Sequence, residues 1–118
     1  MRVLILEDDP LIAMDLQDIL EGEGHDVVGA VASVGDARTH VAAGVDYALL
    51  DVDVADGKSF AIAEELQVRS IPFAFVSGSH PSELPELLQN ADFIAKPYDE
   101  RAILRSLDDG CRSCRKAH

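Results

Sequence analysis

The sequence is poor in basic residues and in long apolar runs, and each shortage excludes a class of protein. Its 118 residues include 10 Lys or Arg against 22 Asp or Glu, for a formal charge of −12. So acidic a surface repels nucleic acid and anionic lipid, and we expect no binding to either. No run reaches the roughly 18 apolar residues of a membrane span, and the apolar run at 3–6 is too short for the core of a signal peptide. We therefore expect a cytoplasmic protein whose partners are divalent cations or other proteins.

Cysteine is also scarce. Cys111 and Cys114 form a single CxxC near the C-terminus. A zinc site would need a second ligand pair, and a redox site would be expected after a strand. We expect two incidental residues on the last turns of a helix. The length and the 47% hydrophobic content predict one domain over residues 1–118, with a flexible tail from about residue 112. The initial Met and this tail favour a complete protein.

Short apolar runs alternate with stretches of helical periodicity, which is typical of an α/β domain with a parallel sheet. Strands are predicted at 3–6, 27–32, 46–52, 72–77 and 92–95. Helices are predicted from 10 to a glycine at 22 or 24, and at 33–43, 59 to about 68, 82–89 and about 100–115. The fourth helix contains Pro85 and is expected to be short or irregular. The pattern predicts a flavodoxin-like, doubly wound (βα)5 sheet in the order 2-1-3-4-5, with its ligand site at the carboxyl ends of the first and third strands.

The periodicity also predicts which side chains of the helices are buried. In the first helix the expected apolar face comprises Leu11, Ile12, Leu16, Ile19 and Leu20. Asp9 is expected to cap that helix, and Asp99 is expected to cap the last one.

Polar side chains follow four of the predicted strands. Glu7-Asp8-Asp9 follow the first, Asp51 and Asp53 the third, Ser77 the fourth and Lys96-Pro97 the fifth. Carboxylates gathered at one edge repel one another unless a cation lies among them, and oxygen ligands with open positions favour Mg²⁺. A nearby lysine balances charge or binds a phosphoryl oxygen.

These residues, in this order, resemble the receiver domain of two-component response regulators over about the whole chain. The resemblance implies that Asp51 accepts a phosphoryl group from a phosphohistidine of a histidine kinase or histidine phosphotransfer protein, with Mg²⁺ as cofactor. Phosphorylation would then control binding to a downstream protein target. Receivers catalyse their own phosphoryl transfer and hydrolysis, so no turnover of a separate substrate is expected.

The resemblance also implies a metal-ligand set. Asp8 and Asp51 would bind Mg²⁺ directly, Glu7 would bind it through water, and the backbone carbonyl of Asp53 would complete the protein ligands. The Asp53 carboxylate adds an acid two places after the acceptor. It could slow phosphorylation, alter dephosphorylation or lie in solvent.

Three further positions match the family's phosphoryl-binding and switching residues. Ser77 and Lys96 would contact the phosphoryl group, and the Lys96–Pro97 peptide would be cis. Phe93 occupies the place of the aromatic residue that changes rotamer on activation. A buried phenylalanine without a switching role explains it equally well.

The stretch from Ile71 to Gly78, IPFAFVSG, is similar to a receiver subgroup with a PFxFxTG-type fourth strand. Members of this subgroup are often stand-alone and associated with the HWE and related histidine kinases. The similarity therefore implies a single-domain regulator in which the usual fourth helix is altered.

Two other functions stay open. One is a degenerate receiver that docks partners without being phosphorylated. The other is a Toprim-like, Mg²⁺-dependent nucleic-acid enzyme with Glu7, Asp51 and Asp53 as its acids, against which the negative charge and Lys96-Pro97 argue. Gly57-Lys58-Ser59 is no phosphate-binding loop, because residue 52 is valine where that motif needs glycine. We expect it to start the third helix, with Asp56 as an ordinary turn residue.

Overall fold

The computed structural model describes the backbone of residues 1–116 and the side chains of residues 1–109. A five-stranded sheet in the order β2-β1-β3-β6-β7 forms its centre, and every neighbouring pair is parallel. Its strands are β1 (Arg2–Leu6), β2 (Asp26–Val31), β3 (Tyr47–Leu50), β6 (Phe73–Ser77) and β7 (Asp92–Ala95). The flavodoxin-like order predicted from the sequence is confirmed.

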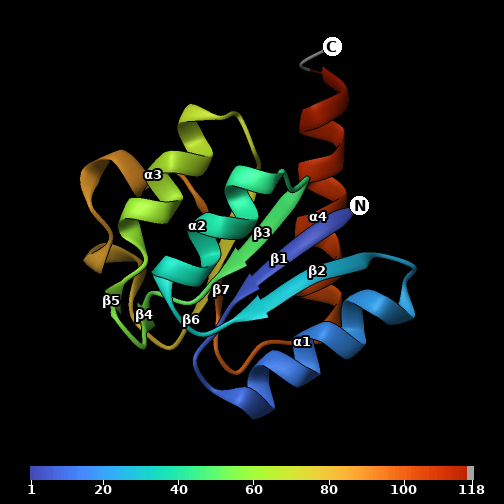
Figure 1. Ribbon diagram of the computed structural model, residues 1–118, viewed down its shortest axis with the longest axis horizontal. Helices are drawn as coiled ribbons and strands as arrows, with labels where there is room; N and C mark the ends of the chain where they lie inside the picture. The colour runs from blue at the N-terminus through green and yellow to red at the C-terminus, as the bar shows by residue number, and fades with distance from the viewer. Residues whose placement is uncertain (117–118) are drawn as a thin grey trace.

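Helices cover both faces of this sheet (Figure 1). They are α1 (Pro10–Gly22), α2 (Val34–Ala43), α3 (Phe60–Val68) and α4 (Glu100–Lys116). Successive side chains of a strand point to opposite faces, so the central strands supply two separate apolar clusters. One cluster packs β1, β3 and β6 against α2 and α3, and the other packs them against α1 and α4. Continuous apolar strands are what a sheet covered on both faces requires.

The predicted apolar face of α1 is partly wrong. Leu16 and Leu20 are buried, but the Leu11 side chain is 75% exposed. At 100° per residue, Leu11 lies about 140° around the helix from Leu16 and so points away from the sheet. The predicted caps are confirmed, since Asp9 accepts the amide of Leu11 at 2.9 Å and Asp99 accepts the amide of Arg101 at 2.6 Å.

The predicted fourth α-helix is replaced by two 3₁₀ turns, η1 (Pro81–Glu83) and η2 (Glu86–Leu88). Prolines limit each turn, because a prolyl nitrogen has no hydrogen to donate. The segment is nevertheless anchored: Leu84 and Leu88 are buried in the cluster beneath α3. The expectation of an irregular element at this place is confirmed.

A small antiparallel hairpin was not expected. It pairs β4 (Asp53–Val54) with β5 (Gly57–Lys58), between β3 and α3. The prediction that Gly57-Lys58-Ser59 begins the third helix is therefore wrong, because that helix begins at Phe60. Gly57 has a φ of 125°, a conformation that suits glycine and closes the hairpin turn.

The expected flexible tail from about residue 112 overlaps the last turns of α4, and its mobility stays a prediction. Residues 117–118 and the side chains of Cys111 and Cys114 lie outside the described residues. Within the part that is described, no helix has the length and apolarity needed to cross a bilayer.

Candidate functional site

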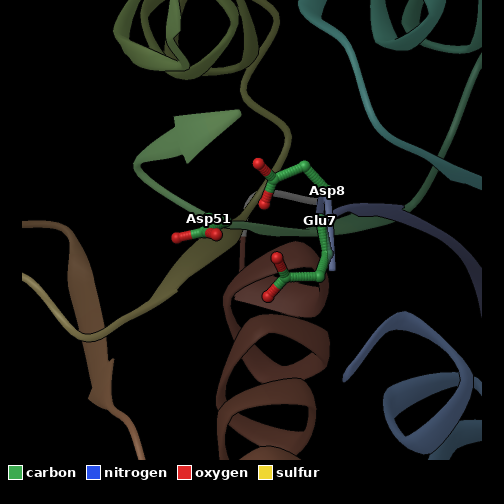
Figure 2. Close-up of side chains that lie close together, drawn as sticks. All are labelled: Glu7, Asp8 and Asp51. Carbon is green, nitrogen blue, oxygen red and sulfur yellow. The ribbon is translucent and has the colours of Figure 1, made fainter. Parts of the chain in front are cut away.

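Three carboxylates meet where β1 and β3 end side by side. Glu7, Asp8 and Asp51 each place an oxygen within 4.8 Å of the others, and Figure 2 shows the three side chains gathered at this edge of the sheet. The parallel pairing continues one residue beyond the strands, because the Asp51 amide donates to the carbonyl of Leu6 at 2.8 Å. The end of the strand thus fixes the acceptor position expected from the sequence.

Lys96 joins this cluster from the end of β7. Its Nζ lies 2.5 Å from Oε1 of Glu7 and 3.3 Å from Oδ2 of Asp51. The Lys96–Pro97 peptide bond is cis, and the Lys96 amide donates to the carbonyl of Ser77 at 2.9 Å. One lysine therefore provides the positive charge between two nearly buried acids.

Burial sets the electrostatics of the site. The Glu7 side chain is 2% exposed. Burial raises the pKa of Glu7 from 4.5 to about 7; the Lys96 hydrogen bond lowers it, and the neighbouring Asp51 raises it. For Lys96, burial alone would lower the pKa, but the bond to Glu7 and the charge of Asp51 raise it overall. Lys96 thus keeps its charge, while Glu7 gains a proton more readily than a glutamate in water does.

This raised pKa predicts how pH changes the stability of the metal-free protein. Because folded Glu7 holds its proton up to about pH 7 and the unfolded residue loses it near 4.5, stability falls as pH rises through this window. The expected loss is about 1–2 kcal/mol after allowance for solvent screening. Glu7→Gln should remove this loss in urea unfolding with EDTA at pH 5 and pH 8. Glu64→Gln, on the exposed side of α3, should keep it; an unchanged pH dependence in Glu7→Gln would contradict the prediction.

Ser77 and Phe93 make their contacts outside the acid cluster. Ser77 ends β6 with 2% exposure, and its hydroxyl accepts the Ser79 amide at 3.1 Å. Phe93 is half-buried on β7, opposite Phe75 in the strand register. It packs against the cluster beneath α3 that also holds Leu84 and Leu88. Its two interpretations, switch or core residue, both fit this position.

The Asp53 carboxylate stands apart from the three clustered acids. It is 60% exposed and forms an ion pair with Lys58 across the hairpin. A Toprim-like site would need this side chain to act with Glu7 and Asp51, so the pairing gives that alternative no support. The Asp53 carbonyl, in contrast, belongs to the backbone just beyond Asp51.

Two contacts of the loop after β3 were not predicted from the sequence. Ser59 is fully buried, and its hydroxyl donates to the carbonyl of Asp51 at 2.5 Å. A serine before a helix is normally read as its cap, but Ser59 makes no side-chain cap bond. Asp56 lies in the expected turn, but its carboxylate accepts the amides of Val34 and Gly35 at the start of α2. No local sequence pattern predicts either contact, because each depends on the conformation of the loop between β3 and α3.

The acid cluster suits a hard divalent cation. Its donors are all carboxylate oxygens, they lie close enough to share one ion, and Asp8 is exposed while Glu7 is buried. Mg²⁺ prefers oxygen ligands and keeps several waters, which an edge open to solvent on one side allows. Burial, and to a smaller extent the neighbouring Asp51, raises the pKa of Glu7, so a cation bound beside this carboxylate would stabilise its ionised form.

The fold and the site together define a class: flavodoxin-like α/β domains with an acid cluster and a paired lysine at the carboxyl edge of the sheet. The chain belongs to the response regulator receiver domain family, whose model matches residues 3–108. It is thus a receiver domain of two-component signalling.

Several relatives in this family are known. The phyllosphere-induced regulator PhyR of Methylorubrum extorquens is 34% identical over 103 residues, which are 82% of this chain and 38% of that protein. The solution structure of SdrG from Sphingomonas melonis Fr1 has a TM-score of 0.82 and 35% identity, covering 94% of this chain and 96% of that one. The anti-anti-sigma factor PhyR of Bartonella quintana has a TM-score of 0.74 and 26% identity, covering 99% and 50%.

Coverage limits what these relatives show. The chain spans 38%, 47% and 55% of the length of three curated regulators that it matches. Their similarity therefore concerns one region of each protein. For SdrG the similarity extends over 96% of that chain, so it concerns nearly the whole of the chain in that structure.

Proposed function

We propose that this receiver accepts a phosphoryl group on Asp51 in a Mg²⁺-dependent reaction and signals through phosphorylation-controlled protein binding. The observation that carries the proposal is the convergence of Glu7, Asp8 and Asp51 within 4.8 Å, with Lys96 bonded to two of them. Each of these residue types has a task in phosphoryl transfer, and the three strand ends bring them together.

The acceptor step uses the chain's own groups as follows. A carboxylate oxygen of Asp51 attacks the phosphorus of a phosphohistidine, forming a P–O bond as the P–N bond breaks. The imidazole leaves and takes a proton from solvent. Asp8, Asp51, the Asp53 carbonyl and, through water, Glu7 would hold Mg²⁺, which would supply positive charge opposite the phosphoryl oxygens.

Lys96 and Ser77 would complete the site. Lys96 exchanges its bond to Glu7 for a phosphoryl oxygen, since it already lies 3.3 Å from Asp51. Ser77 moves its hydroxyl from the Ser79 amide to another phosphoryl oxygen, and the β6–β7 segment repacks around Phe93. Attack of water on the same phosphorus later restores the free carboxylate.

The partners follow from this chemistry. A histidine kinase or a histidine phosphotransfer protein supplies the phosphoryl group, and a downstream protein reads the changed surface. The net charge of −12 favours basic protein surfaces and disfavours nucleic acid and membranes. We place the protein in the cytoplasm, where such donors act. The Bartonella relative is an anti-anti-sigma factor, but this chain matches only 50% of that protein.

The test is phosphorylation by a small donor. Acetyl phosphate with Mg²⁺ should add one phosphoryl group per chain in intact-mass spectra, and EDTA should prevent it. Beryllofluoride with Mg²⁺ should shift amide resonances around the acid cluster. No modification and no shifts would favour a non-phosphorylated docking module instead.

Ser77→Ala should separate metal binding from the switch. Because the acid cluster stays intact, the Mg²⁺ affinity should change by less than about twofold. The beryllofluoride-induced shifts over residues 78–95 should shrink by about half or more, because the phosphoryl group loses its hydroxyl partner. Ser79→Ala is the matched control and should respond like the wild type. If Ser77→Ala showed the full beryllofluoride-induced shifts, Ser77 would have no part in the conformational switch.

A further inference from the structure

The turn of the β4–β5 hairpin is fastened to the start of α2. Oδ1 of Asp56 accepts the amide of Val34 at 2.7 Å, and Oδ2 accepts the amide of Gly35 at 3.3 Å. These partners precede Asp56 by 22 and 21 residues. Asp56 lies in a turn as expected, but its carboxylate also makes these two long-range contacts, which the sequence did not predict.

The contact completes the capping of α2. The first amides of a helix have no partner within it. Ser33 accepts one of them, the amide of Asp36, at 3.2 Å. Asp56 accepts the two that Ser33 leaves, and its negative charge is favourable at this end of the helix dipole. The hydrogen bond from Val34, more than that from Gly35, holds the pKa of the Asp56 carboxyl below its usual range.

Other bonds hold the rest of the same loop. The Ala55 amide donates to the carbonyl of Ala32 at 3.0 Å, and the Ser59 amide donates to the carbonyl of Val52 at 2.9 Å. The Ser59 hydroxyl binds the Asp51 carbonyl. The loop from 51 to 59 is thus anchored beneath the acceptor at its base and on α2 at its tip.

The β2–α2 connection also supports the opposite side of the acid cluster. The Glu7 amide donates to the carbonyl of Val31 at 2.9 Å, four residues before the Gly35 amide that Asp56 binds. Both the acids after β1 and the loop after β3 therefore rest on residues 31–35. A shift of the hairpin tip would change the distance between these two sides.

We propose that Asp56 is a positioning residue of the Mg²⁺ site: by fastening the hairpin to α2, it fixes the loop that presents the Asp53 carbonyl. This inference rests on the proposed function, because that carbonyl is a metal ligand only in a receiver that binds Mg²⁺. Asp56 does not touch the metal or the phosphoryl group. Its effect is on the geometry of the loop, and so on metal affinity.

The test compares two substitutions that remove the same charge from the same end of α2. Asp56→Asn loses one of its two acceptors, whereas Asp36→Asn alters a first-turn acid that makes no bond to the loop among the described residues. The Mg²⁺ dissociation constant is measured by titration calorimetry or by amide shifts. We expect Asp56→Asn to weaken binding about five- to tenfold and Asp36→Asn less than twofold.

A second measurement needs no metal. Amide hydrogen exchange at Val34 and Gly35 should be faster in metal-free Asp56→Asn, while exchange in β1 and β3 stays as in the wild type. Equal Mg²⁺ affinity in Asp56→Asn and wild type would overturn the inference, as would an equal loss in Asp36→Asn, which would indicate a charge effect. If the wild type binds no Mg²⁺, both this inference and the metal step of the proposed function are wrong. If the wild type binds Mg²⁺ and Asp56→Asn binds it equally well, only the role of Asp56 is excluded.

Discussion

Asp51→Asn is expected to abolish phosphorylation by acetyl phosphate, with no added mass after an incubation that saturates the wild type. The amide that replaces the carboxylate carries no negative charge and is a far weaker nucleophile toward phosphorus. Other contacts can be kept, since Oδ1 of Asp51 accepts the Val52 amide at 2.8 Å and an asparagine oxygen can do the same. The variant should therefore fold.

The matched control is Asp53→Asn, which makes the same chemical change two residues later. The Asp53 carboxylate is exposed and paired with Lys58, so its loss should leave the stoichiometry at one phosphoryl group per chain. The same pair of variants also checks the acceptor assignment by fragment mass spectrometry. Modification of Asp51→Asn at any residue in 49–59 would contradict the assignment of Asp51.

Lys96→Ala should slow phosphorylation by about 10²–10³-fold, the effect of removing one preorganised charge from a site of this kind. The lysine neutralises the buried Glu7 and lies 3.3 Å from the acceptor oxygen. Without it, an anionic donor approaches a cluster of acids with one positive charge fewer. Mg²⁺ binding should be unchanged or tighter, because the lysine no longer competes with the metal for Glu7 and Asp51.

Two other cations provide the controls. Lys58→Ala breaks the exposed pair with Asp53, and Arg69→Ala breaks the exposed pair with Glu65 on α3. Each lowers the net charge by the same amount, and each should slow the reaction by less than about threefold. If the phosphorylation rate fell by a similar factor in all three variants, Lys96 would act only through the net charge of the protein. A full rate in Lys96→Ala would exclude it from phosphoryl binding.

The acid cluster could be predicted because its residues stand directly after apolar strands. In a parallel sheet all carboxyl ends meet at one edge, so Glu7, Asp8, Asp51 and Lys96 were brought together by strand order alone. The irregular fourth element was predictable for a similar local reason, since Pro81 and Pro85 interrupt any helix there. These features depend on short patterns and on one rule of topology.

The loop after Asp51 could not be predicted in this way. The segment Gly57-Lys58-Ser59 directly precedes a helix, and its residue types are typical of a helix start. Lys58 nevertheless pairs with Asp53 in a hairpin. Asp56 next to glycine is typical of a turn, yet its carboxylate binds amides 22 and 21 residues earlier. Leu11, in contrast, is exposed for a reason that the sequence contains, since it lies about 140° around α1 from the buried Leu16.

Local sequence patterns were enough to predict the alternating strands and helices, the apolar faces that build the sheet and the chemical groups at each strand end. Hydrophobic periodicity and residue type act over a few neighbours, so they can be read without knowing the fold. Only the packing of distant segments brings Lys96 to both Glu7 and Asp51, Ser59 to the Asp51 carbonyl and the β4–β5 hairpin, through Asp56, to α2. Each of these contacts joins segments whose relative position is set by packing, and no local pattern encodes it.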